Sequence, residues 1–187
     1  MRVLPGMTVL VPADYFETRK AVLAAAKIKG PVYIRFGREK TPVVTSENST
    51  FEVGKANIMR EGTDLTIVAC GPMVAEALDA AEELEKENIS AEVINLHTIK
   101  PLDSETILTS VKKTGAIVTA EEHQMAGGMG SAVFEVLMKE CPVPGEQVGI
   151  NDTFGESGKP RELMEKYGIT SKEIIEKSRQ AVARKNS

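Results

Sequence analysis

The feature that most constrains this chain is a regular alternation between short runs of β-branched residues and longer amphipathic stretches. Thr8–Val11 and Leu65–Cys70 have the length and composition of buried strands. Between such runs, apolar residues recur at helical spacing, as in the stripe of Val74, Ala77, Leu78, Ala81 and Leu84. A chain that alternates strands and helices folds in layers, so we expect a three-layer α/β fold with a mostly parallel sheet.

The first group of elements is a strand–helix–strand unit. We expect strands at Thr8–Val11 and Val32–Phe36. The helix between them runs from Asp14, which stands in capping-box spacing to Glu17, to about Lys29. Its inner face is expected to carry Val22, Leu23, Ala25 and Ala26. Because the connection is a crossover, the strands should be parallel, and a single unit leaves both without most of their sheet partners.

The second group repeats the alternation. A turn signal at Glu61–Asp64 separates Phe51–Arg60 from Leu65–Ala69, which predicts a hairpin and hence one antiparallel edge strand. Further strands are expected at Ala91–Leu96, Ala116–Ala120 and Gln147–Ile150. Helices are expected after Gly71-Pro72, from Asp103 to Lys113, and at about Ser131–Glu140, Pro160–Tyr167 and Ser171–Arg184.

The stretch between the two groups divides the chain into domains. Residues 37–50 contain Pro42 and the polar tract Ser46–Ser49, with little periodicity. We therefore expect a partial α/β segment at residues 1–44, a linker at 45–50 and a complete α/β domain at 51–187.

Composition and charge exclude several classes of protein. The 187 residues carry 23 Lys and Arg against 27 Asp and Glu, and contain no block of basic residues, so nucleic acid is not an expected partner. No apolar stretch approaches the ~20 residues of a membrane-spanning helix, so no membrane partner is expected. Cys70 and Cys141 stand far apart in unrelated contexts, which favours two free thiols and a cytoplasmic protein.

The common catalytic motifs do not occur in the sequence: there is no P-loop, nucleophile-elbow serine, zinc-protease helix or Cys-x-x-Cys, and no metal site is expected. Glu121, Glu122 and His123 end a buried strand, at the edge where open α/β sheets bind ligands. Two carboxylates beside an imidazole can perform acid–base chemistry. Alternatively, these side chains cap loops or form surface ion pairs.

Three further features are candidate binding sites. A glycine-rich segment precedes the helix at 131–140 and consists of Gly127, Gly128, Gly130 and Ser131. Backbone amides at such a helix start can hold an anion, although glycines also let a helix pack closely against a sheet. The polar, glycine-rich loop Asn151–Gly158 suits either tight turns or a docking interface. Arg38 follows a strand end, where a guanidinium suits a carboxylate or a phosphate.

Several strings resemble the thiamine-diphosphate enzymes. Arg2–Asp14 and Gly30–Arg38 resemble the end of the pyrimidine-binding domain of transketolases. The strings that resemble the C-terminal domain of this superfamily are Gly62–Gly71, Val93–Leu96, Ile99–Asp103 and Val118–His123. Deoxyxylulose-phosphate synthases and β subunits of 2-oxo acid dehydrogenases share that domain. The tail, Phe154–Pro160 with Tyr167–Ile169, is most similar to transketolases, above all those split into two polypeptides, in which this would be the C-terminal subunit.

The resemblance also implies what the chain lacks. The family binds thiamine diphosphate and Mg²⁺ through a Gly-Asp-Gly motif, and a glutamate of the pyrimidine-binding domain activates the cofactor. The chain contains no Gly-Asp-Gly, and the segment with that glutamate would precede Met1. The resemblance therefore implies that this chain alone binds no cofactor and holds no catalytic residue. It implies a partner section with the diphosphate-binding domain, and a homo-oligomer.

One functional residue can be matched by position. In transketolases an arginine after a Pro-x-x-Ile-x-x-x segment contacts the phosphate of the sugar substrate, and Arg38 holds that place after Pro31. Three functions follow as alternatives. The chain is the C-terminal part of a transketolase, which moves a two-carbon ketol unit between sugar phosphates; or a scaffold module of the dehydrogenase or synthase type; or a regulatory anion binder that uses Gly127–Ser131.

Overall fold

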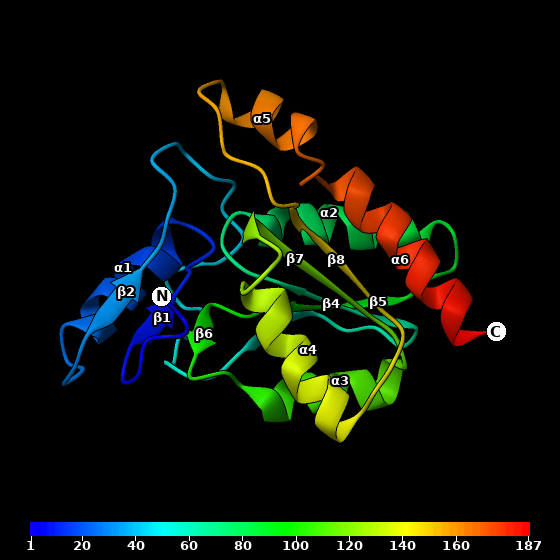
Figure 1. Cartoon of the computed structure of the whole chain (residues 1–187), viewed down its shortest axis with the longest axis horizontal. Helices are drawn as coiled ribbons and strands as arrows, with labels where there is room; N and C mark the ends of the chain where they lie inside the picture. Colours follow the sequence, from blue (N-terminus) through cyan, green and yellow to red (C-terminus); the bar gives the residue numbers. More distant parts are fainter.

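The larger of two sheets forms the centre of the molecule in the computed structural model, which describes all 187 residues (Figure 1). Its strand order is β3-β5-β4-β7-β8. The strands are β3 (Asn57–Arg60), β5 (Ala91–Asn95), β4 (Leu65–Ala69), β7 (Ile117–Gln124) and β8 (Gly145–Ile150). Four of them are parallel, and β3 is the antiparallel edge. The prediction of a mostly parallel sheet with one antiparallel edge strand is confirmed.

Helices cover both faces of this sheet, which gives the three expected layers (Figure 1). On one face lie α2 (Met73–Glu85) and α6 (Ser171–Lys185), and on the other lie α3 (Ser104–Thr114) and α4 (Met129–Glu140). The short α5 (Pro160–Lys166) precedes α6. None of the helices combines the length with the apolar composition that a membrane span requires.

The central strand β4 shows why its sequence is a continuous apolar run. Leu65, Ile67 and Ala69 point into the core beneath α2 and α6, whereas Val68 points into the core beneath α3 and α4. Because neighbouring side chains of a strand alternate between faces, a strand covered on both sides needs apolar residues at nearly every position. All five residues of β4 are buried.

A second sheet joins the N-terminal residues to the rest of the chain. Its order is β2-β1-β6, formed by β2 (Val32–Ile34), β1 (Thr8–Leu10) and β6 (Thr98–Lys100). β1 and β2 are parallel and connected through α1 (Tyr15–Ala25), as the crossover predicts. β6 follows the larger sheet's strand β5 and pairs antiparallel with β1. The expectation that both N-terminal strands lack partners is therefore wrong for β1, while β2 is an edge.

The hairpin predicted across Glu61–Asp64 is wrong. β3 pairs with β5 rather than with its neighbour in sequence, β4. Both sides of β4 are taken by β5 and β7. The fully apolar β4 belongs at the centre of the sheet, and β3, whose Ile58 is exposed, belongs at its edge.

The expected inner face of the first helix is also wrong. Val22 and Leu23 are 46% and 56% exposed, and the buried residues of α1 are Glu17 and Ala21. The helix ends at Ala25 rather than at Lys29. Glu17 is turned toward the larger sheet, where it meets Asn95. A polar contact with the larger domain, rather than the apolar stripe, therefore sets how α1 is rotated.

Candidate functional site

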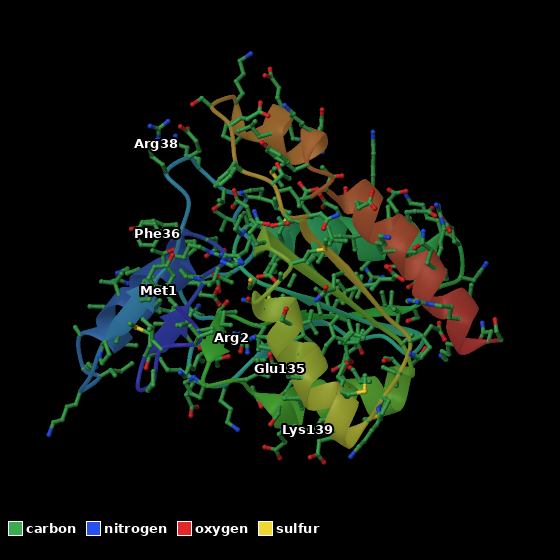
Figure 2. The ribbon with its side chains drawn as sticks, viewed as in Figure 1. Met1, Arg2, Phe36, Arg38, Glu135 and Lys139 are labelled. Atoms are coloured by element: carbon green, nitrogen blue, oxygen red, sulfur yellow. The ribbon has the colours of Figure 1, made fainter.

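The loop that carries Arg38 follows β2 and borders an open cavity of about 450 Å³. Its walls come from the start of α1, from the loop itself and from Pro72. The side chain of Arg38 is 94% exposed, and its Nη2 lies 3.3 Å from Oε1 of Glu39. Figure 2 shows Arg38 at the outer tip of this loop, beyond Phe36. The structure thus places Arg38 where a ligand in the cavity can reach it, and its binding role stays a prediction.

Asp14 connects α1 to the far end of this loop. Its Oδ1 accepts hydrogen bonds from Glu17 N at 3.0 Å and Thr45 Oγ1 at 2.7 Å. Its Oδ2 accepts from Val44 N at 2.8 Å and Thr45 N at 2.6 Å. Burial alone would raise the pKa of Asp14, but the hydrogen bonds from Thr45, Glu17 and Val44 outweigh it and lower the pKa. Asp14 is therefore a buried carboxylate whose acceptor positions are filled.

Glu17 lies at the junction between α1 and the larger sheet. Its carboxyl group accepts from Ala13 N at 2.6 Å and from Nδ2 of Asn95 on β5 at 2.8 Å. Burial raises the pKa of Glu17 to about 7, against those two hydrogen bonds, and the negative charge of Asp14 raises it further. Sequence reasoning identified Asp14 and Glu17 as a cap, and the N-cap bond to Glu17 N is confirmed.

The carboxylate of Glu121 occupies the start of α4. It accepts hydrogen bonds from Met129 N at 2.8 Å and Gly130 N at 2.9 Å, and the residue is 3% exposed. These are the amides at the helix start on which an anion site at Gly127, Gly128, Gly130 and Ser131 would depend. They already bind a carboxylate of the chain, so an external anion would have to displace Glu121.

The rest of the glycine segment has internal partners as well. Ser131 Oγ accepts from Gly127 N at 2.9 Å and donates to Met125 O at 2.8 Å. A side chain on Gly130 would collide with Thr119 and Gln147, which lie on β7 and β8. Gly130 thus allows the close packing of α4 against the sheet, and the anion site predicted for this segment stays a prediction.

Glu122 and His123 are exposed and do not join Glu121 in an acid–base group. His123 Nδ1 donates to Gln124 O at 2.8 Å and lies 3.9 Å from Oε2 of Glu121. The capping interpretation therefore accounts for the motif: one carboxylate caps a helix and the other two side chains face solvent.

The glycine-rich loop 151–158 presents Phe154, whose side chain is 96% exposed. The backbone beside it is fixed, because Gln124 Nε2 donates to Thr153 O at 2.7 Å and Tyr167 Oη donates to Phe154 O at 3.1 Å. The docking interface predicted here stays a prediction. Cys70 and Cys141 are free thiols, and burial raises the pKa of Cys70 to about 12.

The chain's own residues do not suit thiamine diphosphate and its Mg²⁺. No group of three or more His, Cys, Asp or Glu side chains is placed to hold a metal ion. Four of the five buried carboxylates, Asp14, Glu17, Asp103 and Glu121, accept hydrogen bonds from backbone amides, and the fifth, Glu92, pairs with Lys113. No step of a reaction can be assigned to a cofactor held by these residues alone.

Sequence reasoning missed the partners of these carboxylates. Thr45 and Asn95 show no local signal, since they lie 31 and 78 residues from the side chains that they contact. His97 was also missed; it is buried, stacks on Phe51 with ring centroids 4.3 Å apart, and burial lowers its pKa to about 4.

The mostly parallel sheet covered by helices on both faces, together with these motifs, is a domain type that occurs in known proteins. Residues 54–174 match the family model of the transketolase C-terminal domain. The chain therefore belongs to the transketolase C-terminal domain family, as the motifs indicated.

Individual relatives narrow the comparison. The chain is 50% identical over 186 residues to the 6-deoxy-6-sulfo-D-fructose transketolase subunit of Clostridium sp. (strain MSTE9), covering 100% of this chain and 58% of that protein. It is 38% identical over 185 residues to a 1-deoxy-D-xylulose-5-phosphate synthase of Heliobacterium modesticaldum, covering 96% of this chain and 28% of that enzyme. A solved structure described as a split gene transketolase, inactive beta4 tetramer, superimposes with a TM-score of 0.96 at 51% identity, over 99% of this chain and 61% of that one. The chain thus spans little more than half the length of the Clostridium subunit and of the split-gene transketolase chain.

Proposed function

We propose that this chain acts as the C-terminal part of a transketolase, in an assembly that moves a two-carbon ketol unit between sugar phosphates. The observation that carries the proposal is the identity of 50% along the whole chain with a protein named as a transketolase subunit. The position of Arg38 at the mouth of a cavity agrees with a substrate-binding role. We expect a cytoplasmic protein, consistent with its free thiols.

Thiamine diphosphate and Mg²⁺ would be held by a partner section that carries the diphosphate-binding domain. Since the residues of this chain form no metal site, we propose that the isolated chain neither binds the cofactor nor transfers ketol groups. Calorimetric titration of the chain with thiamine diphosphate and Mg²⁺ should show no binding. Binding in the micromolar range would contradict the proposal.

Arg38 would recognise the anionic end of the sugar. A guanidinium presents two parallel N–H groups to a tetrahedral oxyanion, and such charge-assisted bonds contribute roughly 1.5–3 kcal/mol. The name of the 50% identical relative specifies a sulfonated sugar, which supports a terminal anionic group, phosphate or sulfonate, as the feature that is recognised.

The experiment is a reconstitution of the assembly with its diphosphate-binding partner, assayed with fructose 6-phosphate and with fructose as donors. Arg38→Ala should lower kcat/KM for the phosphorylated donor by about 10- to 150-fold and leave the other donor nearly unchanged. Arg38→Lys should recover part of the loss, because it restores charge without the two-pronged geometry. Lys139→Ala, which removes an exposed cation on α4 away from the cavity, is the matched control and should change neither donor. Equal losses on both donors would contradict the role of Arg38.

We also propose that the chain associates with further copies of itself. The solved relative is described as a tetramer, and the exposed apolar side chains Tyr15, Val22 and Leu23 on α1 are unusual for a free surface. Sedimentation of the chain at increasing concentration tests this, and a monomer at all concentrations would refute it.

A second candidate is a scaffold module of the synthase or dehydrogenase β-subunit type, favoured by the 38% identity with a deoxyxylulose-phosphate synthase. A scaffold makes no contact with the sugar. In that case Arg38→Ala would leave both donors unaffected, and Arg38 would be a surface residue.

A further inference from the structure

We propose that Asp14 is a positioning residue that holds the Arg38 loop, so that Arg38 and Lys40 together face one cavity and bind a terminal oxyanion of the substrate. The inference rests on the proposed function and adds to it both a second cation and the group that fixes the pair. The loop spans residues 36–43, between β2 and the clamped residues Val44 and Thr45.

The loop is fixed only at its two ends. At its start, Arg35 N donates to Leu10 O at 2.9 Å, in continuation of the β1–β2 pairing. At its far end, Val44 N, Thr45 N and Thr45 Oγ1 all donate to Asp14. Between these anchors, residues 36–43 make no backbone–backbone hydrogen bond. The carboxylate of Asp14 is therefore what restrains the downstream end of this loop.

The free part of the loop carries two cations and one acidic residue, which gives it a net charge of +1. Arg38 and Lys40 both line it, and Lys40 forms no ion pair. The acidic groups at the cavity are Glu39, which is exposed and lies beside Arg38, and Asp14 itself. Asp14 is 2% exposed and its oxygens already accept four hydrogen bonds, so it offers little repulsion to an incoming anion. If a substrate oxyanion replaces Glu39 as the partner of Arg38, the two cations match the charge of a phosphate monoester, which exceeds one at neutral pH.

The two oxygens of Asp14 divide its contacts unequally. Oδ1 accepts both the N-cap bond of α1 from Glu17 N and the bond from Thr45 Oγ1, whereas Oδ2 accepts only from Val44 N and Thr45 N, at the downstream end of the loop. Asp14→Ser keeps an efficient N-cap oxygen and removes the second oxygen. Thr45→Val keeps Asp14 whole and removes one of the three loop bonds. Thr45→Ser keeps that hydroxyl and is the conservative variant.

Trypsin provides a readout that does not depend on activity, because the loop offers cleavage after Arg38 and after Lys40. Cleavage of the full chain at these two residues should become about tenfold faster in Asp14→Ser, the factor that corresponds to about 1.4 kcal/mol of lost restraint. The rate of cleavage should rise less in Thr45→Val and stay unchanged in Thr45→Ser. Lys20→Met is the matched control: Lys20 Nζ binds Ser46 O and Ser49 O just beyond the clamp, so its loss should not affect cleavage at the loop. Unchanged cleavage in Asp14→Ser overturns the inference.

Kinetics of the reconstituted assembly then test the substrate contact. In Asp14→Ser and in Lys40→Ala, KM for fructose 6-phosphate should rise about tenfold, with kcat and the turnover of fructose little changed. If Asp14 and Lys40 had a purely structural role, the variants would lower kcat/KM equally for fructose 6-phosphate and for fructose. That result would overturn the inference. If the wild-type assembly transfers no ketol group, the proposed function fails, and fructose 6-phosphate is then used as a protectant of the loop against trypsin. Protection of the wild type that is lost in Lys40→Ala supports the inference, and no protection overturns it.

Discussion

The larger domain and the N-terminal segment of this chain are both built from strand–helix–strand units, but they differ in how far these units are buried. In the domain, β4 and β5 are wholly buried and both sheet faces are covered by helices. In the segment, β2 is a partly exposed edge and α1 buries only Glu17 and Ala21. The segment joins the two apolar cores of the domain through β1 and the residues that follow it, since Val9 and Val11 lie in one core and Ala13 in the other. α1, by contrast, meets the domain through the polar contact between Glu17 and Asn95.

This difference shows what an apolar stripe does and does not determine. α2 and α1 both carry apolar residues at helical spacing, but the stripe of α2 is buried and that of α1 is exposed. The spacing of apolar residues identifies which face of a helix is apolar. Whether that face is buried depends on another element packing against it. The larger domain supplies that cover within the chain. The exposed side chains of α1 are consistent with an assembly in which further protein covers them.

The largest expected effect compares one apolar residue from each region. Ile67→Ala on β4 removes a fully buried side chain and should lower the free energy of unfolding by about 2–5 kcal/mol. Leu23→Ala on α1 removes a side chain that is 56% exposed and should cost less than about 0.5 kcal/mol. Urea unfolding of the two variants measures both values. Equal costs would mean that Leu23 is covered as fully as Ile67.

Glu17 provides a pH test of the junction between the regions. Its pKa of about 7 in the folded chain exceeds the ordinary value of 4.5, so the folded state retains a proton that the unfolded chain releases. The stability that comes from neutral Glu17 is complete below pH 4.5 and is lost as pH rises to about 7, a fall of about 3 kcal/mol.

Unfolding curves of the wild type and Glu17→Gln across that range isolate this contribution, since other carboxyl groups titrate in both proteins. The difference between the two should shift in favour of the Gln variant as pH rises. Asp14 lies beside Glu17, and its lowered pKa keeps it charged over that range. A pH-independent difference would show that Glu17 is ionised in the folded chain and that the junction is more polar than its burial indicates.

Glu121 tests the polar features of the domain itself. In the wild type, each oxygen of Glu121 accepts a hydrogen bond from one backbone amide, Met129 N or Gly130 N. Glu121→Gln replaces one of these oxygens by an NH2 group, which cannot accept. The variant should therefore lower the free energy of unfolding by about 1–3 kcal/mol. Glu122→Gln, at an exposed neighbouring position, is the control and should be neutral. Both are measured by thermal unfolding. If a variant of Glu121 gained affinity for inorganic phosphate, the glycine segment would be an anion site that Glu121 normally fills.

The sequence predicted most of the domain and less of its connections. Local signals predict the α/β class, the order of strands and helices, and the caps at Asp14 and Asp103. These signals are the spacing of apolar residues and the glycine and proline residues at the ends of elements. The pairing of β3 with β5, the strand β6 and the clamp of Asp14 on Thr45 do not, because each joins residues far apart in sequence. In the candidate site, Arg38 was identified by resemblance to transketolases. That Glu121 binds the amides at the start of α4 could be seen only in the folded structure.

The smallest expected effect concerns the ion pair between the two regions. Arg2 binds both carboxylate oxygens of Glu135 on α4, at 2.9 and 2.7 Å, and Figure 2 shows the two residues at adjacent positions. Hydrogen bonding to Glu135 raises the pKa of Arg2, so the pair is charged at all ordinary pH values. Glu135 is 62% exposed, however, and solvent screens such pairs.

A double-mutant cycle of Arg2→Ala and Glu135→Ala should therefore give a coupling energy of only about 0.2–1 kcal/mol, and less at high salt. The backbone of the same segment has a second attachment, since Lys100 Nζ donates to Arg2 O at 3.1 Å and Leu4 O at 2.6 Å. Loss of the ion pair should thus leave the N-terminus in place, which hydrogen exchange at β1 would show as unchanged protection. A coupling energy well above 1 kcal/mol, or loss of that protection, would mean that one charged contact holds the segment to the domain. The apolar contacts of Val9 and Val11 and the hydrogen bonds from Lys100 would then not be sufficient to hold the segment in place.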